Sequence, residues 1–264
     1  MLMSIYWLYL ITGAIGGFIG GLLGLGGGII FVPFLFFIFS LYDLHPSHVM
    51  QSAVCTSLVC VILSSLSAAI KHNKNKLINW RLVKIMLPGL ILGSIIGVSV
   101  ITILTSDVIK LYYGILLIII SIYLINEKEK NNYHTNREHK HINIFSFITG
   151  FISNILGIGG GTLTTPYFKF NGESMKTSIA TAAACGVPIA LLGILGVLVI
   201  STIFPIFGKT VLDFIDFHAF FLISVSTLIF SYIGAGVTYK TNTQILKKIF
   251  CMTLFLVGIT ILIY

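Results

Sequence analysis

Two short runs of glycine, each inside a long apolar stretch, are the residues best suited to binding chemistry in this sequence. The run Gly26–Gly28 is matched by Gly159–Gly161, and a proline follows each run at the same spacing (Pro33 and Pro166). Glycines inside a helix cost about 1 kcal/mol each relative to alanine, so we expect each run to divide its stretch into two half-helices. The N–H groups that begin a helix carry roughly half a positive charge, and glycine lets an anion approach them closely. The two breaks therefore predict an anion site built from backbone.

Hydroxyl and amide side chains near the two runs would complete such a site. Asn154 is the most suggestive, because an amide in an apolar stretch is costly to bury without a partner. Serine and threonine often bond instead to their own backbone or to a neighbouring helix, and both roles stay open for Thr56, Ser57 and Thr181. The candidate substrate-binding residues are Gly26, Gly27, Gly28, Gly159, Gly160, Gly161, Asn154, Thr162, Thr165, Thr56, Ser57 and Thr181.

The composition places these residues in a membrane. Hydrophobic residues make up 56% of the chain and charged residues only 9%, and the mean hydropathy is +1.02. The apolar stretches are long enough for spanning helices, which need about 20 residues, and they lack the alternation of barrel strands. The net charge of +8 comes from basic residues between apolar stretches, which indicates orientation in a bilayer rather than binding of nucleic acid.

The apolar stretches also give the order of the elements. A first block at about residues 5–41 contains the first glycine run, and its two arms of about 15–18 residues each are ambiguous between half and full crossings. Further helices of the first half are expected at about 49–70, 82–104 and 108–125. We expect a first transmembrane repeat over residues 1–125, a cytoplasmic linker over 126–141 with mixed charges and histidines, and a second transmembrane repeat over 142–264.

An internal duplication links the two halves beyond the glycine runs. Residues 178–182 correspond to 53–57, so that Thr181 matches Thr56. At a second common offset, Asp216 matches Asn79, and further pairs are Gly234 with Gly97 and Lys247 with Lys110. A repeat of this kind has to be identified before a fold is assigned.

The distribution of charge indicates that the repeats are inverted. Residues 71–84 carry five basic side chains and are predicted to be cytoplasmic, whereas the corresponding residues 201–217 carry one lysine and two aspartates. Conversely, residues 105–110 are nearly neutral and their counterpart 240–248 carries three lysines. Equivalent loops on opposite faces indicate inverted topology. We predict an all-α polytopic membrane protein of two inverted repeats, each a glycine-broken hairpin followed by three transmembrane helices; parallel repeats with four full crossings each are the alternative.

The duplicated block resembles a known family. A glycine-rich segment ending in proline, followed by Ala53–Ser57, and a second copy of both are similar to the TauE/SafE sulfite exporter family of membrane permeases. The resemblance covers essentially the whole chain and implies transport of a small sulfur-containing anion such as sulfite, a sulfonate or a related organosulfur compound. The second copy departs from the first, because Ser153 and Asn154 replace Gly20 and Gly21, so the halves would contribute unequally to a shared site.

Other classes of function find less support. No phosphate-binding GxxxxGK[ST] motif is present, which argues against a built-in ATPase, and the four cysteines show no zinc-ligand spacing. An intramembrane hydrolase needs a nucleophile and a base within reach, but the histidines flank the apolar stretches. A passive anion channel stays open as the alternative to a permease. We expect no cofactor and no metal; the partners would be a small anion and the lipid of the plasma membrane, with a homo-oligomer possible in principle.

Overall fold

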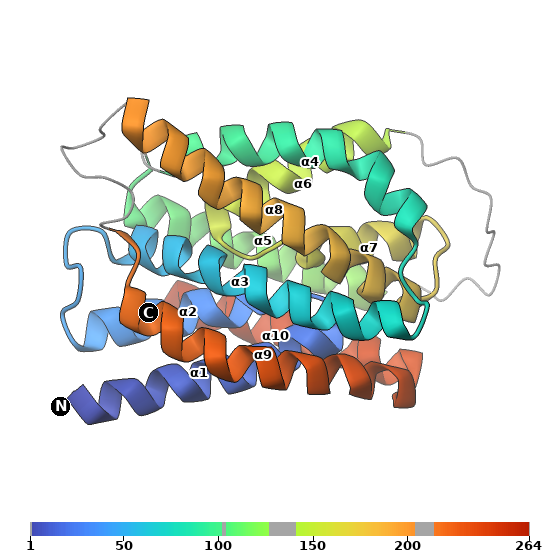
Figure 1. Ribbon diagram of the computed structural model, residues 1–264, viewed down its shortest axis with the longest axis horizontal. Helices are drawn as coiled ribbons and strands as arrows, with labels where there is room; N and C mark the ends of the chain where they lie inside the picture. The colour runs from blue at the N-terminus through green and yellow to red at the C-terminus, as the bar shows by residue number, and fades with distance from the viewer. Residues whose placement is uncertain (1, 102–103, 127–140, 204–213, 264) are drawn as a thin grey trace.

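The computed structural model describes residues 2–101, 104–126, 141–203 and 214–263, and these residues form ten α-helices and no strands (Figure 1). The all-helical prediction is therefore confirmed. The first half contains α1 (Leu2–Leu23), α2 (Gly28–Leu41), α3 (Val49–Lys74), α4 (Trp80–Ile101) and α5 (Ser106–Asn126). The second half contains α6 (Ile142–Leu156), α7 (Gly161–Phe170), α8 (Met175–Ile203), α9 (Phe217–Lys240) and α10 (Thr243–Ile263).

Seven of the described helices are long and apolar enough to cross a membrane. Six of them are the three predicted in each half, and the seventh is α1. The prediction of arms of about 15–18 residues is wrong for α1, which has 22 residues, and for α7, which has 10. The first hairpin is longer because α1 begins well before the repeated segment and continues along α9, whereas α6 begins at Ile142.

The two halves interlock, because each hairpin packs on a helix of the other half. α1 lies along α9, and the corresponding helix α6 lies along α4. α3 and α8 contact each other in the middle, and α5 contacts α10. α3 and α8 are the most strongly buried of the seven candidate spans. The pattern of helix contacts is thus the same when the two halves are exchanged.

Glycine lets the hairpins and their partner helices approach closely. Gly13, Gly17 and Gly21 on α1 face Ile223, Thr227 and Ser231 on α9 so closely that a Cβ would overlap α9. On α4, glycines at the same spacing of four face α6 in the same way: Gly89, Gly93 and Gly97. Such stripes of small residues are the usual means of close helix packing in lipid.

Corresponding helices run in opposite directions. The order of the contacts shows that α1 and α9 run the same way, as do α4 and α6. In Figure 1, α1, α3 and α9 run from left to right, while α4 and α8 run from right to left. α1 therefore opposes its counterpart α6, α3 opposes α8, and α4 opposes α9.

Candidate functional site

The two glycine breaks meet at the centre of the molecule. A Cβ on Gly28 would overlap the carbonyl of Gly157, and a Cβ on Gly161 would overlap the carbonyl of Gly24. Each half therefore contributes a glycine that contacts the break of the other half. The structure thus places the two predicted glycine runs side by side, although they lie far apart in the sequence.

Backbone conformation explains why the breaks require glycine. Gly26 and Gly27 have φ values of +70° and +79°, and Gly159 has a φ of +67°. These values lie in the left-handed region, which side chains with a Cβ rarely adopt. The first arm of each hairpin ends at a further left-handed glycine, Gly24 in the first half and Gly157 in the second. The chain then reverses, so that α2 returns along α1 and Gly16 contacts Phe31.

Both return arms begin at the breaks with backbone N–H groups that lack an acceptor in the described structure. Leu25 N–H donates to Gly20, and Ile30 and Phe31 N–H both donate to Gly27. Within the described residues, the N–H groups of residues 26–29 have no acceptor, and the same holds for residues 159–163 at the start of α7. The N-termini of both half-helices therefore offer unpaired donors and the positive end of a helix dipole.

Two of the candidate hydroxyls secure the starts of other helices. Thr56 Oγ1 accepts a hydrogen bond of 3.0 Å from the N–H of Asp216, which precedes α9. Thr181 Oγ1 accepts a bond of the same length from the N–H of Asn79, which precedes α4. Both pairs were matched by the internal duplication, so the same bond forms twice, each time between the two halves.

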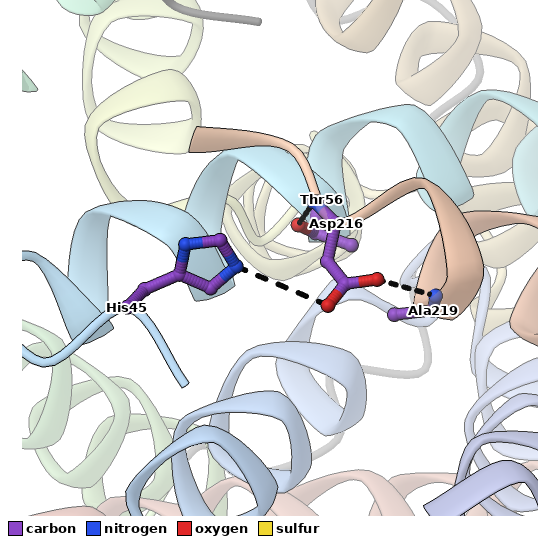
Figure 2. A network of polar contacts seen from close by, with 4 residues as sticks. All are labelled: His45, Thr56, Asp216 and Ala219. Atoms are coloured by element: carbon purple, nitrogen blue, oxygen red, sulfur yellow. Dashed lines mark hydrogen bonds and ion pairs between the residues drawn. The ribbon is translucent and has the colours of Figure 1, made fainter. Parts of the chain in front are cut away.

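Figure 2 shows the surroundings of the first of these bonds. Asp216 caps α9, because its Oδ1 accepts the N–H of Ala219 at 2.8 Å, and its Oδ2 lies 3.9 Å from His45 Nε2 in the loop after α2. Burial raises the pKa of Asp216, but the His45 ring and the Ala219 N–H outweigh burial and hold that pKa below its ordinary value. At the opposite end of the molecule, Asn79 Nδ2 donates to Glu173 Oε1 at 3.1 Å.

The remaining candidate side chains differ in whether their polar atoms have a hydrogen-bond partner within the protein. Ser57 Oγ donates to the carbonyl of Gly157 at 2.8 Å and so ties α3 to the second break. Asn154 Nδ2 donates to the carbonyl of Gly150 at 2.9 Å, but its Oδ1 is buried without a partner in the described structure. The hydroxyls of Thr162 and Thr165 are buried and unpartnered in the same sense.

The sequence reasoning missed Ser65. Its hydroxyl is buried on α3 beside the first break, at Gly26, and has no hydrogen-bond partner among the described residues. A signal was present in the spacing, because Ser57, Val61 and Ser65 follow at intervals of four and share one face of a helix.

Comparisons with known proteins agree with this architecture. A probable membrane transporter protein of Haemophilus influenzae is 27% identical over 253 residues, which cover 96% of each chain. A probable membrane transporter protein of Methanocaldococcus jannaschii is 32% identical over 70% of this chain and 69% of its own. A further one, YunE of Bacillus subtilis, is 31% identical over 59% of this chain and 64% of its own. No solved structure matches the chain.

The family model described as "Sulfite exporter TauE/SafE" matches residues 9–261, which is nearly the whole chain. The family and these relatives are described as membrane transporters and not as enzymes. The protein is a multi-pass membrane transporter, and it belongs to the TauE/SafE sulfite exporter family.

Proposed function

We propose that the protein carries a small sulfur-containing anion, such as sulfite or a sulfonate, across the plasma membrane. The observation that carries the proposal is the contact of the two glycine breaks, where both α2 and α7 begin. A buried anion needs compensating positive charge, and the described membrane segments hold no buried lysine or arginine there. The unpaired N–H groups at the two helix starts supply that compensation without a formal charge.

Hydroxyl groups would complete the coordination of the anion. Thr162 and Thr165 lie in the first turns of α7, and their buried hydroxyls are unpartnered in the described structure. A buried polar group without a partner costs about 1–3 kcal/mol, so a ligand that accepts these donors would recover that free energy. Thr56 and Thr181 act at the edge of this site, because their bonds place α9 and α4 against the central pair α3 and α8.

The two halves, residues 1–125 and 142–264, would act as inverted repeats around this site. The opposed directions of corresponding helices support inversion, and so does charge. Basic residues gather from the end of α3 to the start of α4, and they would mark the cytoplasmic face: Lys71, Lys74, Lys76 and Arg81. Binding at a repeat interface formed by interrupted helices is the usual design of secondary transporters.

Flux into proteoliposomes tests the proposal. Radiolabelled sulfite, thiosulfate and a small sulfonate would be offered under imposed pH and voltage gradients. Saturable uptake of one of them is expected, and the gradient that drives it identifies the coupling. Flux that rises without saturation would indicate a channel, and no flux of any of the three in folded protein would refute the substrate class.

A glycine variant links the flux to the site. Gly160 has a φ of −74°, so Gly160→Val adds bulk at the second break, against Ile189, without left-handed strain. We expect this variant to fold and to lose flux. Gly196→Val is the matched control, since its nearest neighbour to an added Cβ is Ile95 at 3.6 Å, outside the breaks. Equal flux in the two variants would contradict a site at the glycine breaks.

A further inference from the structure

Three buried serines lie close together on α3, and one of them differs from the others. The Ser64 hydroxyl faces α9, because it donates to the hydroxyl of Ser231 at 3.5 Å. Ser67 Oγ donates to the carbonyl of Leu228, also on α9, at 2.7 Å. Ser65 is fully buried as well, yet its hydroxyl has no hydrogen-bond partner in the described part of the chain.

The Ser65 hydroxyl also does not take the bond that a helix offers locally. Serine and threonine in helices commonly donate to the carbonyl four residues earlier, as Ser146 does to Ile142 and Thr253 does to Ile249. A buried hydroxyl that forgoes every such bond costs free energy of folding. A ligand that accepts a hydrogen bond from Ser65 would recover this free energy.

The position of Ser65 places this hydroxyl at the first glycine break. Its Oγ lies 2.5 Å from the place where a Cβ on Gly26 would stand, and 2.6 Å from the corresponding place on Gly186 of α8. Both positions therefore have to be glycine, because a Cβ at either one would overlap the Ser65 hydroxyl. Gly26 immediately precedes the unpaired N–H groups that begin α2, so hydroxyl and N–H groups are available to the same ligand.

The internal duplication shows that only one half supplies this group. With Thr181 matching Thr56, Ala190 matches Ser65 and Gly186 matches Val61. Ala190 is also fully buried but carries no donor. At the crossing of α3 and α8, the first half thus provides a hydroxyl and the second half provides the space for it.

We propose that Ser65 is a substrate-binding residue whose hydroxyl donates to an oxygen of the transported oxyanion at the first glycine break. This assignment rests on the proposed function. In the present closed arrangement the hydroxyl fills the gap between Gly26 and Gly186. When α3 and the first hairpin separate, the oxyanion enters that gap and accepts the hydroxyl together with N–H groups of α2.

Ser65→Ala and Ser67→Ala, on the same helix, make a matched pair for the test. Flux of the transported anion is measured as a function of concentration, and thermal unfolding is measured on the same purified proteins. Ser65→Ala is expected to raise KM about tenfold or more, because it removes a hydrogen bond to a charged group. It should unfold at the same or a higher temperature than the wild type, since it removes an unpartnered buried hydroxyl. Ser67→Ala loses the 2.7 Å bond to the carbonyl of Leu228, so it should unfold at a lower temperature with an unchanged KM.

An unchanged KM in Ser65→Ala would overturn the proposal. If the wild type transports none of the sulfur anions, the proposed function fails, and labelling then decides the role of Ser65. Ser65→Cys is expected to react with a small methanethiosulfonate reagent in proteoliposomes, above the baseline of the wild type, whose four cysteines are buried. Ser64→Cys, which faces α9, should stay at that baseline. Failure of Ser65→Cys to react would remove Ser65 from any transport path and overturn the proposal independently of the substrate.

Discussion

Asp216 allows the contribution of one helix cap to be separated from that of one charge. Its side chain is 14% exposed, accepts the Ala219 N–H at 2.8 Å and lies 3.9 Å from His45 (Figure 2). Loss of an N-cap costs about 0.5–2 kcal/mol, and a partly exposed ion pair contributes about 0–1 kcal/mol. Asp216→Ala is therefore expected to lower the free energy of unfolding by about 0.5–3 kcal/mol.

Asp216→Asn keeps the cap and removes the charge. Asparagine caps helices about as well as aspartate, and the matching residue of the first half, Asn79, is an asparagine that accepts the N–H of Leu82. The variant should therefore lose at most about 1 kcal/mol. Unfolding in detergent with increasing SDS measures both variants against the wild type. A loss in Asp216→Asn as large as in Asp216→Ala would refute the assignment of the stability to the cap.

The pH dependence of this difference has a defined sign. The pKa of Asp216 is lower in the folded protein than its ordinary value, which is about 3.9 in an unfolded chain. The stabilisation is therefore complete above the unfolded value and is lost as pH falls through the folded pKa. The wild type should exceed Asp216→Asn in stability near neutral pH, and the two should converge below about pH 4. A difference that grows with acidification would contradict the reasoning.

Two further variants test the contacts between the halves. Thr181→Val keeps the volume but leaves the Asn79 N–H without its acceptor, so we expect a loss of about 1–3 kcal/mol in SDS unfolding; a wild-type midpoint would show that the bond is dispensable. Gly21→Ala places a Cβ against the Ser231 carbonyl and should lower the unfolding midpoint by overpacking, about 1–3 kcal/mol. In Gly196→Ala the added Cβ has room, so it should be neutral or stabilising; equal losses in the two glycine variants would indicate a general effect of helix glycines and not a contact between α1 and α9.

Local sequence pattern was sufficient to predict the elements and the breaks. Consecutive glycines in an apolar stretch predicted a break between two half-helices, and the structure adds that Gly26, Gly27 and Gly159 are left-handed there. The helices after the first hairpin were placed to within a few residues of α3, α4 and α5. The length of α1 was not predicted, because the residues that extend α1 at its N-terminal end are as apolar as the helix itself. Hydropathy alone therefore does not separate the extension from the repeated part of the helix.

The contacts between the two halves could not be predicted from the local sequence pattern. The duplication paired Thr56 with Thr181 and Asp216 with Asn79. It could not show that Thr56 accepts the N–H of Asp216, or that Thr181 accepts the N–H of Asn79. Ser65 escaped notice for the same reason, since its neighbours Gly26 and Gly186 belong to different elements. The identity of the anion, the inversion across the bilayer and the domain boundaries stay predictions.

The interlocking of the halves has a consequence for biosynthesis. α1 leaves the ribosome well before α9, which is the helix that covers its glycine stripe. α4 likewise has to wait for α6. During translation the first hairpin therefore rests in lipid with its close-packing face open and its glycine break without the opposing break. A chain interrupted in the second half would present this unfinished surface to the membrane quality-control machinery, which makes the late helices decisive for whether the early ones survive.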